Sequence, residues 1–454
     1  HFPARLLHLA QHTARHCEDA YDILTPIMGY RPSQRVDVSI SDYGDLANGS
    51  ATGLPAPRIV LYAAPPRLDS TLGDYDNWLR LLIFHEFIHI LQLDRVAGIP
   101  ALINAIFGRS LSPNQNLPSF VLEGGAVWAE SHTSGRGRIH SALFRGFLRA
   151  QALEGRLHGI DAMTHVPGEW PDANIWYLYG GHFFHWLIEN RGHTWLAAFH
   201  DDIADDLVPY GINRAMKRAS GDTFHQLYAE WTSYVRQRAQ DLRGRLESEG
   251  LTARTPLTTT GRGHTRPRFL KGGQLLTLDS GRQRTAIRIR DLDHTVDDPA
   301  PEFFYERGLS DFDPCGQRNR IIYTRTMRTL GAYRYQDLFV WERDSNQVRR
   351  LTRGARIREP ACAPDGRWAV ASQIRDGGTR LIRIDLRNGR ITPLLAGHPL
   401  DQHAFPVVAP NGESVVFVRV KVSGERELMA LDLTDGQTQT LVAGPALKLH
   451  PSFS

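Results

Sequence analysis

The sequence predicts a multidomain protein in which a mainly helical α+β domain, residues 1–250, precedes an all-β domain, residues 251–454. The chain of 454 residues is longer than one domain usually is. Its first half follows helical periodicity, whereas its second half alternates short β-rich runs with Asn-Gly and Asp-Gly turns. A polar, glycine-containing segment at residues 248–261 separates the halves and suits a linker.

The composition is that of a globular protein, with 41% hydrophobic and 22% charged residues. It excludes a disordered, collagen-like or coiled-coil chain, and no apolar run is long enough to predict a transmembrane segment. The net charge is +4, but basic residues form no block, so we expect no nucleic-acid partner. The three cysteines, Cys17, Cys315 and Cys362, form no C-x-x-C motif, so we expect neither a disulfide framework nor a cysteine metal site.

The first half opens with an amphipathic helical pattern at residues 5–29, followed by strand-like runs at residues 36–40 and 58–62. A long apolar run then predicts a helix over residues 76–93, with Asp74 or Asp76 as its cap.

This helix carries the strongest chemical signal, His85-Glu86-Phe87-Ile88-His89. On a helix, His85 and His89 share one face because they are four residues apart. Two imidazoles placed in this way can bind one Zn²⁺, and Glu86 is adjacent to a water bound by the metal. The alternative interpretation is a core helix with two hydrogen-bonded histidines.

A catalytic zinc site requires a third protein ligand and one open position. Glu123 lies 34 residues after His89, where Pro118-Ser119 predicts the start of another helix. The sequence thus predicts His85, His89 and Glu123 as ligands of one Zn²⁺ per chain. A surface glutamate near a helix start is the alternative for Glu123.

Two further segments carry a family resemblance. Glu123-Gly124-Gly125-Ala126 and the helix-like segment from Tyr177 to Glu189, with its Tyr-x-x-Gly start, resemble motifs of gluzincins, the metallopeptidases of thermolysin and aminopeptidase-N type. The resemblance implies a thermolysin-like zinc peptidase domain over residues 1–245. It also implies that Glu86 is the general base and that Tyr177 donates a hydrogen bond to the oxyanion. Tyr179 is the alternative if the register is shifted.

One motif of the aminopeptidase-N-like enzymes is missing. They carry Gly-x-Met-Glu-Asn on an edge strand beside the cleft, whereas this chain has no glutamate between Glu18 and Glu86. Residues 48–52, Asn-Gly-Ser-Ala-Thr, occupy the comparable place. An endopeptidase or oligopeptidase is therefore slightly favoured over an aminopeptidase.

Several other residues are candidates for supporting roles. Asp94 and Glu130 are candidates to hold a ligand imidazole in its tautomer, as outer-shell carboxylates do. His182, beside the Tyr-x-x-Gly segment, is interpreted as a packing or outer-shell residue.

The second half contains an internal repeat. Four similar openings end at Gly273, Gly316, Gly366 and Gly412, spaced by 43, 50 and 46 residues. Apolar-alternating runs also meet hairpin turns at 388–389 and 435–436. A period of about 45 residues with four short strands per unit is typical of a β-propeller. An irregular β-sandwich is the alternative.

The openings carry a second resemblance. Pro360-Ala361-Cys362-Ala363-Pro364-Asp365-Gly366, followed by Trp368-Ala369-Val370-Ala371, resembles the repeats of TolB-type propellers over residues 262–454. The repeat length predicts four to five blades, and a fifth copy begins at His450. We therefore expect the natural chain to continue. The resemblance also implies a location in the bacterial periplasm, on the cell surface or outside the cell.

Together, these features predict a zinc-dependent peptidase that cleaves peptides or unfolded proteins with a metal-activated water. The propeller is expected to gate substrates or to bind a protein partner. The main alternative is an envelope binding or scaffold protein, with little or no catalysis, whose propeller docks a partner. A zinc hydrolase that acts on other substrates is the third interpretation.

Overall fold

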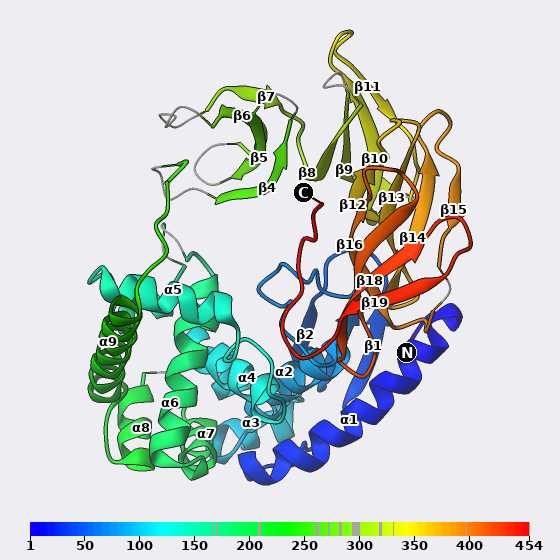
Figure 1. Cartoon of the computed structure of the whole chain (residues 1–454). Helices are drawn as coiled ribbons and strands as arrows, with labels where there is room; N and C mark the ends of the chain where they lie inside the picture. Colours follow the sequence, from blue (N-terminus) through cyan, green and yellow to red (C-terminus); the bar gives the residue numbers. More distant parts are fainter. Residues whose placement is uncertain are drawn as a thin grey trace. The chain divides into compact units, whose positions relative to one another are not determined.

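The computed structural model (Figure 1) describes the chain except residues 167, 169–170, 208–209, 259–262, 271–272, 281–283, 293–299, 317–319, 330, 396 and 454. The described residues divide into two compact units. One comprises His1–Ser41 with Ala47–Leu251, and the other comprises Asp42–Leu46 with Thr252–Ser454. Lys271 and Gly272 of the first repeat and residues 259–261 of the expected linker lie outside the described residues.

The first unit is mainly helical, as its periodicity predicts. Its α-helices are α1 (Leu7–Met28), α2 (Trp78–Leu93), α3 (Gly98–Phe107), α4 (Ser119–His132), α5 (Ala142–Leu153), α6 (Gly181–Arg191), α7 (Thr194–Ala204), α8 (Ile212–Ser220) and α9 (Phe224–Glu249). Its short helices are η1 (Ala4–Leu6), η2 (Pro113–Asn116), η3 (Ile160–Thr164) and the π-helix η4 (Trp176–Gly180). The helices predicted at residues 5–29 and 76–93 are confirmed.

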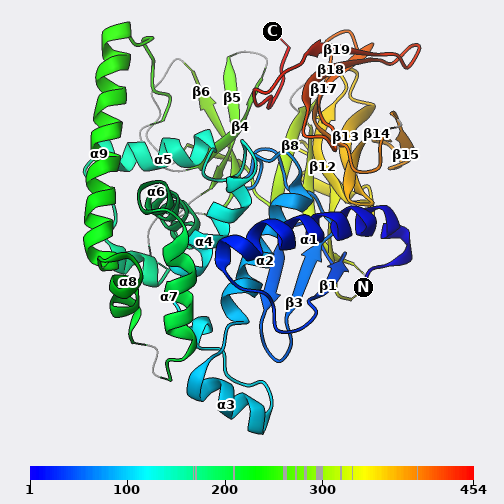
Figure 2. The ribbon, with the colours of Figure 1, turned by 90° about the horizontal axis from the view of Figure 1, so that it is seen from below.

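A small sheet of three strands lies against α2. The strands are β1 (Asp37–Ser41), β2 (Gly49–Thr52) and β3 (Arg58–Tyr62), in the order β1-β3-β2. β1 is parallel to β3, and β2 is antiparallel to it. α2 contacts both β2 and β3, and Figure 2 shows β1 and β3 beside α1. β1 and β3 were predicted from the sequence, but β2 was not, because Gly, Ser and Ala give a weak strand signal.

The cap of α2 differs from the prediction. The Asn77 side chain accepts hydrogen bonds from the backbone N–H groups of Leu79 and Arg80, at 3.0 and 3.2 Å. Asp74 instead pairs with Arg136. Asparagine is as good a cap as aspartate, so sequence preference alone did not separate the candidates.

The second unit contains four sheets, each of four antiparallel strands joined in sequence order. The first sheet comprises β4 (Gly263–Phe269), β5 (Gln274–Ser280), β6 (Ala286–Asp291) and β7 (Glu302–Phe304). The second sheet comprises β8 (Leu309–Cys315), β9 (Arg320–Thr329), β10 (Tyr333–Glu342) and β11 (Gln347–Arg350). The third sheet comprises β12 (Ile357–Cys362), β13 (Trp368–Arg375), β14 (Gly378–Asp385) and β15 (Ile391–Pro393). The fourth sheet comprises β16 (Gln402–Val408), β17 (Ser414–Val420), β18 (Arg426–Asp432) and β19 (Thr438–Val442).

These sheets are arranged as propeller blades. The first strands of successive sheets contact one another, β4 with β8, β8 with β12, and β12 with β16. Successive sheets also share buried apolar clusters. Ile287 and Tyr323 belong to one cluster, and Trp368 and Phe417 belong to another. Four blades are described, within the predicted four to five, and residues 450–453 of the expected fifth copy form no strand.

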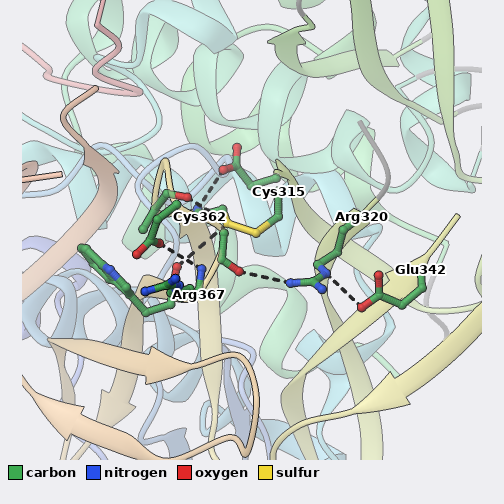
Figure 3. The surroundings of a disulfide bond; sticks show 10 residues. Cys315, Arg320, Glu342, Cys362 and Arg367 are labelled. Carbon is green, nitrogen blue, oxygen red and sulfur yellow. Dashed lines mark hydrogen bonds and ion pairs between the residues drawn. A yellow bond between two sulfur atoms is a disulfide. The ribbon is translucent and has the colours of Figure 1, made fainter. Parts of the chain in front are cut away.

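A disulfide joins two neighbouring blades, contrary to the prediction from the sequence (Figure 3). Cys315, at the end of β8, is bonded to Cys362, at the end of β12, with 5.4 Å between their Cα atoms. The two cysteines are 47 residues apart, which is one repeat. Equivalent positions of neighbouring blades lie side by side, so a wide separation along the chain becomes a short distance in space. Cys17 is free.

Residues 42–46 belong to the second unit. The Arg356 side chain pairs with Asp42 at 2.8 Å and with Asp45 at 2.6 Å.

In the described part of the chain, no single helix is both long and apolar enough to cross a membrane. α2 and α3 meet that test only as a pair bent by 93°.

Candidate metal centre

Three side chains that can bind one metal ion converge from α2 and α4. Nε2 of His85 lies 3.2 Å from Oε2 of Glu123, and Nε2 of His89 lies 3.4 Å from the same oxygen. One ligand atom from each residue lies within 4.8 Å of the other two. The described chain contains no second group of three His, Cys, Asp or Glu residues with this geometry. The structure thus brings the three predicted ligands together.

The arrangement fits a zinc ion. Oε2 of Glu123 is buried, and two imidazole nitrogens face it. A buried carboxylate is costly unless a cation or a hydrogen-bond donor lies beside it. Two imidazole nitrogens and one carboxylate oxygen, with one position left open, form the ligand set of a catalytic zinc site.

The electrostatics of the three groups also favour a cation. Burial lowers the pKa of His85, but the carboxylates of Glu123 and Glu130 outweigh this effect and raise the pKa to about 9. Burial raises the pKa of Glu123, yet the facing imidazoles of His85 and His89 lower it far below its ordinary value. Without a metal, these shifts favour a proton on His85 beside an ionised Glu123, and a metal ion that binds the three side chains takes the place of that proton.

Glu86 lies beside the ligands and against β2. Its side chain is 4% exposed, and burial raises the pKa of its carboxyl group. A Cβ atom added at Gly49 would lie 2.6 Å from Oε1 of Glu86, so the β2 backbone passes very close to this carboxylate. Glycine at this position therefore allows the strand to approach the site.

A buried ion pair orients the first ligand. Nδ1 of His85 lies 3.0 Å from Oε2 of Glu130, so it donates a hydrogen bond while Nε2 faces Glu123. Arg138 donates to both oxygens of Glu130, at 2.8 and 2.6 Å. Both side chains are nearly inaccessible, at 1% for Glu130 and 6% for Arg138. Glu130 thus lies where an outer-shell carboxylate was predicted, whereas Arg138 was missed because no sequence motif marks it.

The second ligand is oriented by an amide. Nδ1 of His89 lies 3.1 Å from Oε1 of Gln92, whose own amide donates to the carbonyl of Leu122. Gln92 was not predicted as a partner of His89, although it follows His89 by three residues on the same helix and therefore lies on the same face.

Asp94 lies elsewhere. Its carboxylate accepts hydrogen bonds from Tyr30 and Ser33, at 2.8 and 2.6 Å, and pairs with Arg109. The structure thus places Asp94 among these side chains and gives it no bond to either ligand imidazole.

The two tyrosine candidates point to different surroundings. The Tyr177 ring lies 6.2 Å from the His85 ring, and the Arg138 guanidinium lies 4.5 Å from the Tyr177 ring centre. Burial and the nearby Glu123 carboxylate raise the pKa of Tyr177 to about 12. Tyr179 is fully buried and donates to Oε1 of Gln151 at 2.6 Å. The geometry therefore favours Tyr177 as the tyrosine of the site.

Small residues bring Tyr177 close to Glu123. A Cβ atom at Gly124 would lie 2.8 Å from the Gly180 carbonyl oxygen, and one at Gly181 would lie 2.4 Å from Cγ1 of Val127. α4 and η4 can therefore pack closely only because these positions lack side chains. The π-helical turn η4 then presents Tyr177 beside Glu123.

His182 lies behind this segment. Its Nδ1 lies 2.8 Å from the carbonyl oxygen of Leu178, and its ring stacks on Phe144. It makes no hydrogen bond to a ligand, which agrees with its interpretation as a packing residue.

Comparisons with known proteins concern the propeller fold. No protein-family model matches the sequence, and no curated protein matches it. The solved structure of TolB from Acinetobacter baumannii is similar over 44% of this chain and 48% of its own, with 18% identity and a TM-score of 0.36. That of putative TolB from Agrobacterium tumefaciens is similar over 38% of this chain and 62% of its own, with 19% identity and a TM-score of 0.32. The β-propeller domain of the Trilobed protease from Pyrococcus furiosus is similar over 39% of this chain and 51% of its own, with 16% identity and a TM-score of 0.28. The chain thus spans less than two thirds of each of these structures.

Proposed function

We propose that this chain is a zinc-dependent peptidase that hydrolyses peptide bonds. The observation that carries the proposal is the convergence of His85, His89 and Glu123, with the carboxylate of Glu86 beside them. A structural zinc site is normally closed by four protein ligands, whereas three ligands leave a position for water and substrate.

Each residue of the site has a separate role in the proposed hydrolysis. His85, His89 and Glu123 would hold the zinc ion, which would supply Lewis acidity to lower the pKa of water and to polarise a carbonyl group. Glu86 accepts a proton from the attacking water and transfers it to the leaving amine. Its buried position raises its pKa and so makes it a better proton acceptor. Tyr177, whose raised pKa keeps its hydroxyl protonated at neutral pH, donates to the developing oxyanion.

Strand β2 supports an extended substrate beside these groups. Within its sheet β2 pairs only with β3, and its glycine lies against Glu86. An unpaired strand edge can bind an extended peptide through backbone hydrogen bonds. β2 contains no carboxylate that could pair with a free amino terminus. We therefore favour cleavage within peptides over removal of the first residue.

We assign substrate selection or partner binding to the second unit. We also propose that the protein works in an oxidising compartment, such as the periplasm, the cell surface or the exterior. The Cys315–Cys362 disulfide supports this location, because structural disulfides persist mainly in oxidising compartments.

The test compares the intact chain with Glu86→Gln on internally quenched peptides whose amino termini are either free or acetylated. The variant should keep its zinc and lose turnover, because the amide cannot accept the proton. Equal cleavage of acetylated peptides supports an endo- or oligopeptidase. A fully active Glu86→Gln protein contradicts the mechanism. Full zinc occupancy without cleavage of any peptide favours the binding or scaffold alternative.

A further inference from the structure

A cavity lies within the first unit, between α5, α6 and α9. Its volume is about 540 Å³, within the usual range for sites that bind small molecules. Its lining includes neither the three proposed metal ligands nor Glu86 nor Tyr177. It is therefore distinct from the candidate metal centre.

One wall of the cavity is apolar and aromatic. Leu148 of α5, Trp186 of α6, and Trp231 and Val235 of α9 line it. Trp231 is 1% exposed, and its ring packs on Phe183. Such a surface binds the apolar body of a ligand.

The other feature of the cavity is an excess of unpaired positive charge. Arg145 and Arg149 of α5 and Arg238 and Arg245 of α9 line it, and none pairs with a carboxylate in the described chain. By contrast, Arg191 of α6 pairs with Asp222, and Arg243 of α9 pairs with Glu247.

Two carboxylates, Glu189 and Asp241, also line the cavity, but neither pairs with these arginines. Guanidinium groups bind carboxylates and phosphates through paired hydrogen bonds. Unpaired arginines around a hollow therefore favour an anionic group.

His182 adds a hydrogen-bond acceptor. Its Nδ1 must carry the hydrogen, because it lies 2.8 Å from the Leu178 carbonyl oxygen, which only accepts. Burial lowers the pKa of His182 to about 4, so the ring is neutral at pH 7. Its Nε2 is then an acceptor, and this buried atom has no partner in the described chain. A ligand N–H or O–H group can satisfy it.

From these features we infer that the cavity binds a small organic anion with an apolar body, one carboxylate or phosphate group, and a hydrogen-bond donor. The arginines of α5 and α9 bind the anionic group, the tryptophan wall binds the body, and His182 accepts from the donor. This site is additional to the proposed peptidase site and requires no bound metal.

Three related probes test each part of the inference by calorimetry on the full chain. Indole-3-acetate carries an aromatic body, a carboxylate and an N–H donor. Indole-3-acetamide lacks the charge, and 1-naphthaleneacetate lacks the N–H group. Indole-3-acetate should bind with a Kd below about 1 mM, and each of the other two should bind at least about tenfold more weakly.

Variants locate the binding. The double variant Arg145→Gln, Arg149→Gln should weaken indole-3-acetate binding at least about tenfold. Arg236→Gln, an exposed arginine of α9 that does not line the cavity, should leave it unchanged. Glu123→Ala should also leave it unchanged, which separates this site from a carboxylate bound to zinc.

Three results overturn the inference. They are no binding at millimolar probe, equal binding of the acetate and the amide, or binding lost in Glu123→Ala but kept in the double variant. The comparison of probes on the unmodified chain remains decisive if the double variant does not fold. Loss of peptidase activity has no bearing on these outcomes, so the two proposals succeed or fail separately.

Discussion

Nδ1 of His85 lies 3.0 Å from Oε2 of Glu130, and Arg138 holds both oxygens of that carboxylate. This buried chain fixes the imidazole so that its Nε2 faces Glu123. The guanidinium also covers the Tyr177 ring at 4.5 Å. One arginine thus connects the orientation of a proposed metal ligand with the position of the proposed oxyanion donor.

The first prediction concerns Glu130. Glu130→Gln weakens the acceptor for His85 and should reduce zinc affinity by about 10–100-fold, as outer-shell changes do. Competition with a fluorescent chelator measures the effect. Glu154→Gln, an exposed glutamate remote from the ligands, is the matched control. Unchanged zinc affinity in a folded Glu130→Gln protein would show that the contact does not orient the ligand.

The second prediction separates the two tyrosines. Tyr177→Phe should lower kcat by about 10²-fold, because one oxyanion donor is lost, while zinc stays bound. Tyr179→Phe should leave kcat nearly unchanged and lower stability by about 1 kcal/mol, because the hydrogen bond to Gln151 is lost. Steady-state kinetics and denaturant unfolding on both variants measure these effects. The reverse pattern would assign the role to Tyr179.

The third prediction is a pH dependence of stability. His200 is fully buried, and burial lowers its pKa to about 3 from an ordinary value of 6.5. The unfolded chain therefore binds a proton on this residue below pH 6.5 that the folded chain does not accept. The contribution of neutral His200 to the free energy of unfolding is therefore complete above pH 6.5. It is lost as the pH falls toward 3, by at most about 1.4 kcal/mol per pH unit.

Denaturant unfolding between pH 7 and 4.5 tests this dependence. His200→Gln should flatten the curve, whereas His225→Gln, at an exposed position, should leave it unchanged. A curve of the same steepness in His200→Gln would show that other groups carry the acid sensitivity.

The fourth prediction concerns the disulfide between blades. Replacing Cys315 and Cys362 by serine should destabilise the second unit by about 2–4 kcal/mol, because the cross-link restricts the unfolded chain. A reducing agent should destabilise the natural chain by a similar amount and leave the double variant unaffected. Mass spectrometry of unreduced peptides checks the bond directly. Free thiols at both positions in the purified protein would contradict it.

Sequence patterns predicted the local features of this molecule well. The amphipathic 3.6-residue period located α1, and a long apolar run located α2. The roughly 45-residue repeat predicted blades of four strands. The i, i+4 spacing put His85 and His89 on one face of α2, and the Glu-Gly-Gly segment identified Glu123. These features depend on short-range geometry, which a sequence shows directly.

Features that depend on tertiary contact were missed. β2 has few β-forming residues and is a strand because β3 pairs with it. Arg138 contacts His85 from 53 positions along the chain, after α4 has ended. The Cys315–Cys362 bond was predictable in principle, since its spacing equals one repeat. Recognising it required placing the repeats side by side.

Elemental analysis of the purified chain beside Glu123→Ala, with Glu154→Ala as control, tests the central claim most directly. After equilibration with zinc and dialysis at neutral pH, the account predicts about one zinc per chain in the natural protein and the control. Glu123→Ala should bind much less zinc, because one of three ligands is lost. No zinc in the natural chain, or equal zinc in Glu123→Ala, would contradict the proposed metal centre.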